Sequence, residues 1–412
     1  MREHLLVSGI EKAFGWQDAG SLGQKVERGK LTDSTLNERL MTPSRLLDII
    51  TRRQLDPPRL RLFQDGRELH PDTFLRAGVN RRRQQVRMLD PESVTELLDA
   101  GVTLVLDGVE TFDPVVEVAT RALRWWSREL VQVNAYLTTR AADGFGLHWD
   151  DHDVIIVQLA GEKSWEVRAA SRAAPMFRDA EPNDTPSDEI VWRGILRPGD
   201  VLHIPRGHWH QATRPDHQEP VSLHLTFGFT RRTGVDWLAW IADQARGQEL
   251  FRHDLLRSAS PAALEDERGR LTQAAVALLR SLSPADFLAA REQGQPSARL
   301  APVVPSAGDP AAVVCVTEFP PRLEPDGRNP DGRNIVVQAA GKRIVFRDRA
   351  APALDLLLSG TPVDVASLGA RTGLDARPLA RVLVREGICA ALTPELAAGY
   401  TGLIPAGPCS SE

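Results

Sequence analysis

The chain has 412 residues, of which 42% are hydrophobic and 25% charged, and its formal net charge is −5. This is ordinary globular composition with room for two or three domains, and neither the charge nor any apolar run indicates a membrane or nucleic-acid partner. The cysteines, Cys315, Cys389 and Cys409, form no CxxC motif, which argues against a disulfide framework or a cysteine-based zinc site. The charged N-terminus lacks the apolar core of a signal peptide, so we expect a cytoplasmic protein.

The first 130 residues mix helix and strand signals. Residues 59–71 alternate in polarity and contain the turn dipeptide Asp65-Gly66, which predicts a hairpin, and residues 102–109 are typical of a short buried strand. Helix-spaced apolar residues with start and stop signals predict helices at 40–55, 91–101 and 112–130. We expect an α/β lead-in to a larger sheet.

Residues 131–230 change to short runs rich in Val, Ile and Leu, interrupted by Gly, Pro and Asp. Many short strands separated by turn signals predict a β-sandwich or barrel. A polar, proline-containing segment among them, residues 178–190, is expected to be a surface loop. The predicted strands are residues 131–139, 153–161, 164–170, 201–205 and 221–230.

Helical spacing returns at residues 234–255 and 261–293, and the Pro/Gly/Ala-rich residues 295–312 are typical of a linker. The last hundred residues contain strand and helix signals of their own and predict a separate small unit. We therefore divide the chain into residues 1–230, 231–298 and 312–400.

The stretch HWDDHDVIIVQLAGEKSW begins with His148 and has Asp150 two residues later. Residues i and i+2 of an extended strand point to the same face, so an imidazole and a carboxylate can reach one metal ion. An isolated HxD pair is weak evidence, because short motifs arise by chance. The later stretch RPGDVLHIPRGHWHQA, however, can place His210 on an adjacent barrel strand. Two histidines and one carboxylate with three open positions suit non-haem Fe(II) and oxygen chemistry.

Other residues of these segments are open alternatives as ligands: Asp151, His152, Asp153 and His208. On a regular strand Asp151 points to the face opposite Asp150. His152 and Asp153 reach the metal only if the chain turns there. His208 shares the face of His210 in an extended segment, so it is the main rival. We expect His203 to pack within its strand, and His224 to line the cavity or to be a core histidine.

These motifs resemble those of the JmjC-type cupin dioxygenases, and among them the ribosomal oxygenases, which are protein hydroxylases that use Fe(II) and 2-oxoglutarate. The family pattern is H-x-D, a strand ending in Q-x-x-G-x-K/R-x-W, and G-D-x-L-x-[IF]-P-x-G-x-x-H, and all of it occurs in this order within residues 30–230. The resemblance implies an α+β fold with a double-stranded β-helix (cupin, or jelly-roll) core and an N-terminal α/β elaboration. It also implies a helical dimerisation region and a C-terminal winged-helix-like domain.

The resemblance further implies that Fe(II) is bound by His148, Asp150 and His210, which sets His208 aside, with 2-oxoglutarate and O2 as cosubstrates. Lys163, fifteen positions after His148, would pair with the distal carboxylate of 2-oxoglutarate, because a cation inside a barrel needs an anionic partner. From spacing alone, an exposed lysine on a turn is the simpler interpretation. Three more residues are placed near the cosubstrate by the resemblance: Tyr136, Asn134 and Thr226.

The resemblance implies an enzyme, an Fe(II)- and 2-oxoglutarate-dependent dioxygenase that hydroxylates an amino-acid side chain of a protein or peptide, with a ribosomal protein as one candidate. Three alternatives stay open: tailoring of a peptide natural product, demethylation of an N-methyl group through the same hydroxylation, and a non-catalytic metal-binding cupin regulator. Relatives of this kind also imply a homodimer. Residues 313–395 hold eleven basic and ten acidic side chains, so we expect no nucleic-acid partner there.

Overall fold

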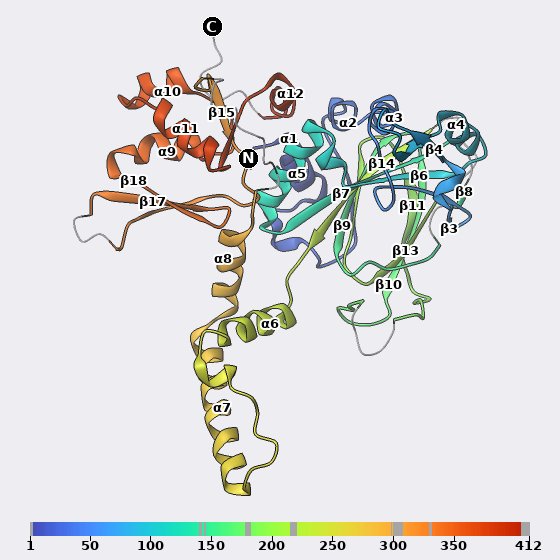
Figure 1. Ribbon diagram of the computed structural model, residues 1–412. Coiled ribbons are helices and arrows are strands. Elements are labelled where there is room, and N and C mark those ends of the chain that lie inside the picture. Colours follow the sequence, from blue (N-terminus) through green and yellow to red (C-terminus); the bar gives the residue numbers. More distant parts are fainter. Residues whose placement is uncertain are drawn as a thin grey trace.

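The computed structural model describes residues 3–139, 142–143, 146–177, 183–214, 221–297, 299, 308–328 and 332–404. The chain folds into a β-rich body, a helical arm that projects from it, and a small α/β unit beside the N-terminal helices (Figure 1). No helix in these ranges is both long and apolar enough to cross a bilayer. The predicted loop and linker, residues 178–190 and 295–312, lie partly outside the described residues.

The first third of the chain contains five α-helices with strands among them: α1 (Leu5–Phe14), α2 (Thr35–Leu40), α3 (Pro43–Arg52), α4 (Pro91–Asp99) and α5 (Pro114–Ser127). The last three each start at a proline. Proline has no backbone N–H, which costs nothing in the first turn, because the N–H groups there have no partner within the helix. In α5 the Asp113 carboxylate also accepts hydrogen bonds from the N–H groups of Val115 and Val116. The sequence predicted these three helices, but α1 and α2 were not predicted.

Apart from a separate hairpin at residues 75–89, the strands of the body form two sheets, in which every neighbouring pair is antiparallel. The larger sheet has the order β1-β12-β9-β14-β7-β6-β2-β3 and the smaller one the order β11-β10-β13-β8. This pair of sheets is the predicted jelly-roll core. The strands are β1 (Glu27–Lys30), β2 (Leu60–Gln64), β3 (Arg67–Glu68), β6 (Thr103–Asp107), β7 (Leu130–Thr138), β8 (Ala142–Asp143), β9 (Asp153–Ala160), β10 (Lys163–Ala170), β11 (Ile190–Leu196), β12 (Asp200–Ile204), β13 (His208–Arg214) and β14 (Ser222–Thr230).

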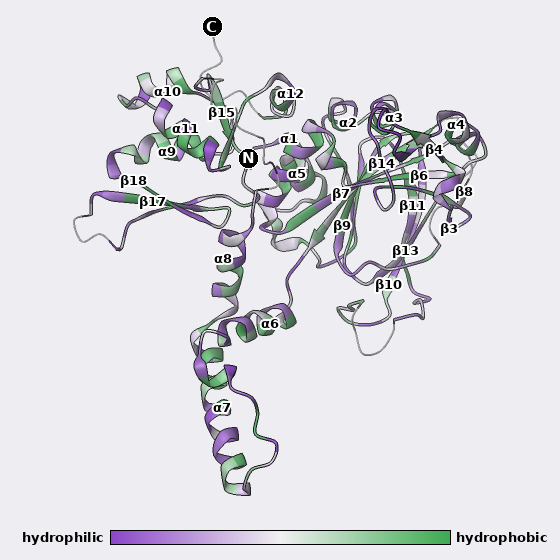
Figure 2. Ribbon diagram, viewed as in Figure 1, coloured by the Kyte–Doolittle hydropathy of each residue, from purple (hydrophilic) through white to green (hydrophobic). Residues whose placement is uncertain are grey.

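Strand β9 explains why the apolar run after the His-Asp segment is unbroken. Its side chains alternate between two cores: Ile155 and Val157 join the main core with the helices. Val154 and Ile156 instead join a smaller cluster that includes residues of both sheets. A strand buried on both faces needs no polar side, so the sequence shows no alternation there. Figure 2 shows this interior as the hydrophobic green along β7 and β9.

After β14 the chain forms the arm, which consists of α6 (Gly234–Ala245), α7 (Pro261–Ser281) and α8 (Pro284–Gly294) (Figure 1). The helix predicted at 234–255 is shorter than expected, because α6 ends at Ala245 and only a 3-10 turn follows, at Glu249–Arg252. The small unit has two three-stranded sheets, β19-β15-β20 and β16-β17-β18. Its elements are β15 (Ala312–Cys315), β16 (Arg322–Pro325), β17 (Asn334–Ala339), β18 (Lys342–Arg347), α9 (Ala351–Leu357), β19 (Val363–Asp364), α10 (Val365–Thr372), α11 (Arg377–Arg385), β20 (Cys389–Ala391) and α12 (Pro394–Ala397).

Candidate metal and cosubstrate site

A short backbone bridge holds two histidines from distant parts of the sequence side by side. The His148 N–H donates to the carbonyl of His210 at 3.1 Å, and the His210 N–H donates back to the carbonyl of His148 at 2.7 Å. Their ring centroids are 4.4 Å apart. The segment before β9 is thereby attached to β13, the strand that carries His210.

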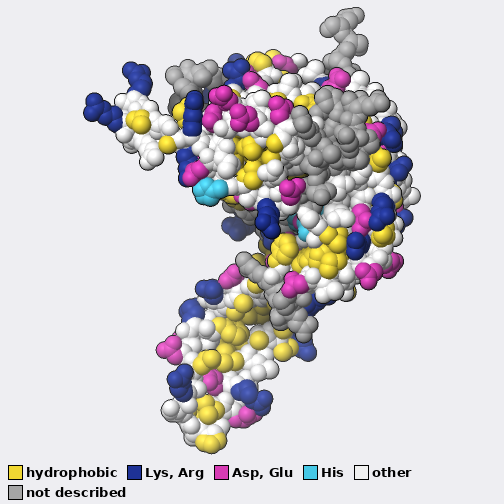
Figure 3. Space-filling model, turned by 90° about the vertical axis from the view of Figure 1, so that its right-hand side faces the viewer, with side chains coloured by type: hydrophobic (Ala, Val, Ile, Leu, Met, Phe, Trp, Pro, Cys, Tyr) yellow, Lys and Arg dark blue, Asp and Glu magenta, His cyan; other side chains and the backbone are white. Residues whose placement is uncertain are grey.

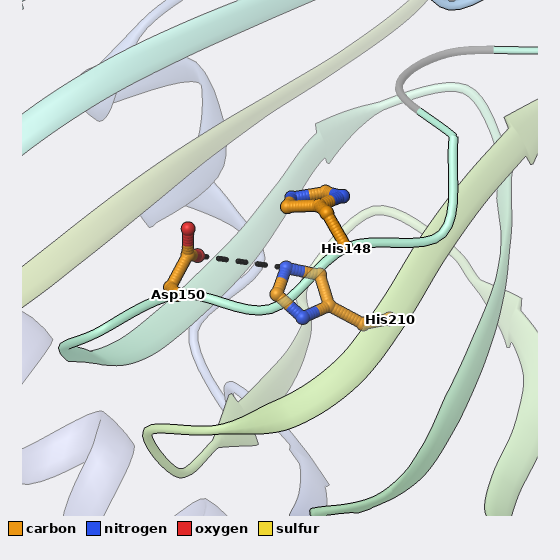
Figure 4. A group of neighbouring side chains, drawn as sticks. All are labelled: His148, Asp150 and His210. Atoms are coloured by element: carbon orange, nitrogen blue, oxygen red, sulfur yellow. Dashed lines mark ion pairs between the residues drawn. The ribbon is translucent and has the colours of Figure 1, made fainter. Parts of the chain in front are cut away.

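Asp150 completes a cluster of three with these histidines (Figure 4). Its Oδ2 lies 3.5 Å from Nε2 of His210, and one donor atom from each of the three side chains lies within 4.8 Å of the others. Among the described residues, this is the one group of three or more His, Cys, Asp or Glu side chains with metal-binding spacing. The structure therefore brings together the three residues proposed as ligands from the sequence.

Backbone carbonyls fix which nitrogen of each ring faces the cluster. Nδ1 of His148 lies 2.8 Å from the carbonyl oxygen of Gly146, and Nδ1 of His210 lies 3.0 Å from that of His208. A carbonyl oxygen can only accept, so each Nδ1 carries the hydrogen and each Nε2 keeps a lone pair for a metal. Burial, the largest cause, lowers the pKa of His210 to about 4, so this ring is neutral near pH 7.

The rival histidine, His208, lies outside the cluster because the neighbouring strand bulges. On β10, Val167 pairs with His210, and it is Ala170, three residues later, that pairs with His208. Three steps along β10 therefore match two steps along β13, which is a β-bulge. The i, i+2 rule for a regular strand fails at such an irregularity, so His208 does not accompany His210 into the cluster.

The other alternative ligands have structural partners of their own. The Asp153 carboxylate is buried, accepts the Arg206 N–H at 2.8 Å and lies 3.6 Å from the Arg231 guanidinium. Nδ1 of His152 lies 3.7 Å from the Asp151 carboxylate. None of these side chains belongs to the three-residue cluster.

His203 packs inside its strand, as the sequence predicted. Its Nδ1 lies 2.8 Å from the carbonyl oxygen of Lys25, and its Nε2 accepts the Gly23 N–H at 3.2 Å. Both ring nitrogens are thus used in holding the segment before β1 against β12. A histidine with both nitrogens engaged in this way has a structural role.

The cluster opens into a cavity of about 420 Å³ between the two sheets. Alternate residues of β7, β9, β10, β13 and β14 face this cavity, as the two-residue period of a strand requires. All seven residues that were placed at the site from the sequence line it: His148, Asp150, His210, Lys163, Tyr136, Asn134 and Thr226. The structure brings these residues together, and their individual roles stay predictions.

Lys163 is buried, with 2% of its surface exposed, so the simpler interpretation as an exposed turn lysine is wrong. Its Nζ donates to Oγ1 of Thr138 at 3.1 Å, and that hydroxyl lies 3.2 Å from Oγ1 of Thr103. Sequence reasoning missed both threonines. Strand parity offered a signal for Thr138, which lies two residues after Tyr136 on β7 and so shares its face.

His224 lines the cavity, one of the two outcomes left open for it. Its ring stacks on Tyr136 with centroids 4.7 Å apart and meets the edge of Trp165 at 5.5 Å. Burial, and then the charge of Lys163, hold the pKa of His224 well below its ordinary value, so the ring stays neutral. The neutral ring of His224 therefore adds no second positive charge beside Lys163.

Comparison with known proteins agrees with this geometry. Residues 114–236 match the family model described as the JmjC domain. This chain contains a JmjC domain. The matched range holds all seven cavity residues named above, and the resemblance to the JmjC ribosomal-oxygenase branch that the motifs indicated is confirmed.

Curated proteins similar to the JmjC chain include "Ribosomal oxygenase 1" of Rattus norvegicus, which is 34% identical over 152 residues, 36% of this chain and 25% of that protein. Another is the "Bifunctional lysine-specific demethylase and histidyl-hydroxylase NO66" of Aedes aegypti, 30% identical over 213 residues, 50% of this chain and 29% of that protein. The chain thus spans between a quarter and a third of the length of these curated relatives.

Among solved structures, one of Escherichia coli YcfD covers 90% of this chain and 95% of its own, with a TM-score of 0.56 and 20% identity. A second structure of YcfD, described as a ribosomal oxygenase in complex with cobalt and 2-oxoglutarate, covers 89% of this chain and 95% of its own, with a TM-score of 0.55 and 19% identity. At this identity the likeness shows a shared fold.

Proposed function

We propose that this JmjC protein is an Fe(II)- and 2-oxoglutarate-dependent oxygenase that hydroxylates a side chain of a protein or peptide. One observation carries the proposal: two histidines, one carboxylate and a buried lysine line the same cavity. The names of its relatives, ribosomal oxygenase and histidyl-hydroxylase, support a protein substrate, and a ribosomal protein is the first candidate.

The donor set fits the proposed metal. His148 and His210 offer Nε2 lone pairs because their Nδ1 atoms face carbonyl oxygens, and Asp150 adds one negative charge. Two imidazoles and a carboxylate are the protein ligands of non-haem Fe(II) oxygenases. When bound, Fe(II) with 2-oxoglutarate and O2 would supply the oxidation of an unactivated C–H bond.

The other cavity residues would bind and orient the cosubstrate. Lys163 offers the terminal carboxylate of 2-oxoglutarate a cation in a nearly dry environment, where charge-assisted hydrogen bonds are strong. Tyr136, Asn134 and Thr226 add polar groups on the neighbouring strands β7 and β14. The apolar side chains of Val154 and Ile156 form part of the wall and limit the entry of water.

A second candidate reaction is demethylation of an N-methyl group, which the name of the NO66 relative favours. The same oxidation applied to an N-methyl carbon gives an unstable product that loses formaldehyde. The residues of the cavity would have the same roles in both reactions, so the substrate decides between them.

The test is mass spectrometry of ribosomal proteins and peptides incubated with the enzyme, Fe(II), 2-oxoglutarate and O2, together with an assay for succinate. Hydroxylation adds one oxygen atom, about 16 Da, whereas demethylation removes a CH2 unit. We expect Asp150→Asn to abolish turnover, because it removes a negative ligand and nearly preserves shape. The matched control is Asp151→Asn, the same change at the next residue, which lies outside the cluster. Full activity of Asp150→Asn, or no turnover by the native protein with any substrate, would favour a non-catalytic metal-binding regulator.

We also propose that the chain has the three-part organisation expected from the sequence, with boundaries near 1–230, 231–298 and 312–400. The helices α9, α10 and α11 beside the sheet β19-β15-β20 support a winged-helix-like unit at the C-terminal end. The arm supports a homodimer, because α7 has 21 residues and only Leu278 among them is buried. Figure 3 shows hydrophobic side chains along this arm, in the lower part of the view.

A further inference from the structure

A hairpin apart from both sheets of the body carries an unusual charge. It consists of β4 (Leu75–Val79) and β5 (Gln85–Leu89) and follows β3, the edge strand of the larger sheet. Residues 74–89 contain five arginines and no acidic residue, in a chain whose net charge is −5. These arginines are all exposed: Arg76, Arg81, Arg82, Arg83 and Arg87.

The hairpin presents its arginines on an ordered frame. Phe74 and Leu75 are buried, with 1% and 5% exposed, and anchor its base. At the tip, Oδ1 of Asn80 accepts the N–H groups of Arg82 and Gln84 at 2.9 and 3.0 Å. Asn80 also pairs with Gln84 through its backbone N–H and its side-chain amide. The loop at residues 81–83 therefore has a defined shape, so its three arginine side chains share one end of the ribbon.

Most of this charge is not used within the protein. Arg87 pairs with Asp72 at 3.1 Å, while no carboxylate in the described ranges forms an ion pair with the other four arginines of the hairpin. Arginine is abundant throughout this chain, but elsewhere acidic residues are interspersed: residues 313–395 hold eleven basic and ten acidic side chains. A run of exposed, unneutralised guanidinium groups indicates a polyanionic partner.

We propose that the β4–β5 hairpin binds the phosphate backbone of RNA, with Arg81, Arg82 and Arg83 as the main contacts. One guanidinium group can donate two hydrogen bonds to the oxygens of one phosphate. It can also stack on unpaired bases, which RNA loops expose. A membrane surface fits less well, because insertion into a membrane needs a large apolar surface and the hairpin exposes just two large apolar side chains, Val79 and Met88. The choice of RNA rests on the proposed function, since a ribosomal protein is a substrate found in contact with RNA.

The test measures the binding of the full chain to a fluorescent RNA stem-loop by anisotropy, over a series of salt concentrations. The variant is the triple change R81E/R82E/R83E. The control is R371E/R377E/R385E, which alters the charge equally on exposed arginines of the C-terminal unit. We expect the hairpin variant to bind RNA at least tenfold more weakly and its salt dependence to fall by about 2 to 3 in log–log slope, since each phosphate that is no longer neutralised lowers the slope by about 0.7–0.9. The control should bind as the native chain does.

The proposal is overturned if the native chain does not bind RNA, if the hairpin variant binds as tightly as the native chain, or if the control loses the same affinity. It is also overturned if the triple change abolishes binding to vesicles of anionic lipid and leaves RNA binding intact. Thermal unfolding shows whether the variant is folded, and succinate release with a free protein substrate tests the oxygenase separately. Lost RNA binding with intact turnover supports both proposals, whereas RNA binding without any turnover rejects the oxygenase alone.

Discussion

At the scale of single residues, Lys163 shows how position decides chemistry. A buried ammonium group is costly unless polar groups surround it, and here Oγ1 of Thr138 accepts one of its hydrogen bonds at 3.1 Å. A carboxylate in the cavity would be a stronger partner than a hydroxyl, because its opposite charge attracts the ammonium group in addition to accepting the hydrogen bond. The native chain thus keeps a costly cation where an anionic cosubstrate would lie.

Replacing this cation is therefore expected to affect the ligand more than the fold. Lys163→Met keeps the length of the side chain and removes the charge, and a charged hydrogen bond is worth about 1.5–3 kcal/mol. We expect the Kd for 2-oxoglutarate to rise by about 10- to 150-fold, with the melting temperature unchanged or higher. Calorimetry with the metal-loaded protein measures the Kd. Lys25→Met, at a lysine whose side chain is 73% exposed, is the control. An unchanged Kd in Lys163→Met would remove Lys163 from the site.

His4 gives a second prediction, far from the cavity. It caps α1, where its Nδ1 accepts the Leu6 N–H at 3.1 Å, and burial, the largest cause, lowers its pKa to about 3. The unfolded chain binds a proton at His4 below the ordinary pKa of 6.5 and the folded chain does not, so acid favours unfolding. As the pH falls below 6.5, His4 should therefore lower the free energy of unfolding by about 1.4 kcal/mol per pH unit, or by about 2 kcal/mol between about pH 6.5 and pH 5.

The measurement compares urea unfolding of the native chain and of His4→Asn at about pH 7 and pH 5. Asparagine is a strong helix cap and does not titrate in this range, so the variant should lose less stability on acidification. The other buried histidines are present in both proteins and cancel in the comparison. Equal losses in the two proteins would show that His4 is protonated in the folded state.

The sequence could predict much of the site, but partly for a reason that the structure corrects. Strand parity placed His148 and Asp150 on one face, yet both precede β9, which begins at Asp153. Backbone hydrogen bonds to His210 and Gly207 hold the segment instead. Parity alone left His208 as a rival, and only the motif removed it. The bulge that separates His208 from His210 depends on pairing with β10, which no local pattern reveals.

At the scale of elements, the sequence predicted the helices and strands that are stabilised by interactions between residues close together in the chain. The helices α3, α4 and α5, which start with proline, and strands with continuous apolar runs, such as β9, were predicted. The short helix α12, which also starts with a proline, was not. Strand β11 was missed, and β13 was expected only as a strand that carries His210, with no bounds. Their residues, Ile190–Leu196 and His208–Arg214, mix polar and apolar side chains without a clear period. Both become strands by pairing with β10 on its two sides. Such pairing joins segments far apart in sequence, so a short sequence window contains no trace of it.

The β9–β10 turn is an element whose shape fixes the site. Gly161 has a φ of +57°, in the left-handed region, and an added Cβ would lie 2.0 Å from the carbonyl oxygen of Val221. We expect Gly161→Ala to cost about 2 kcal/mol or more in the free energy of unfolding, because alanine disfavours this backbone conformation and its Cβ would clash. It should also weaken 2-oxoglutarate binding, because Lys163 follows two residues later. Gly269→Ala, in α7 with nothing within 4 Å of the new Cβ, is the control and should gain about 0.5–1 kcal/mol. A native-like stability of Gly161→Ala, measured by urea unfolding, would contradict this.

At the scale of the whole molecule, the arm is the part whose structure its own contacts explain least. The body and the small unit bury continuous cores, whereas α7 exposes Leu264, Val276 and Leu279 by 37%, 37% and 39%. Helices in globular proteins gain most of their stability from packing one face, so a long helix with so little buried surface needs a partner. A second copy is the partner that we propose, because the same apolar surface would be covered on both chains.

The dimer is tested by changing this surface. Val276→Glu combined with Leu279→Glu places two like charges on the face that would meet the second copy, where burying them unpaired is costly. Light scattering should give twice 45.4 kDa for the native chain and 45.4 kDa for the variant. Ile190→Glu, at a residue of β11 that is 45% exposed, controls for the loss of an exposed apolar side chain elsewhere and should stay dimeric. A native chain that remains monomeric over a wide concentration range would refute the dimer. If the double variant is monomeric, an assay of its succinate release tests whether the cavity works without the second copy. We expect turnover, because residues of a single chain line the cavity.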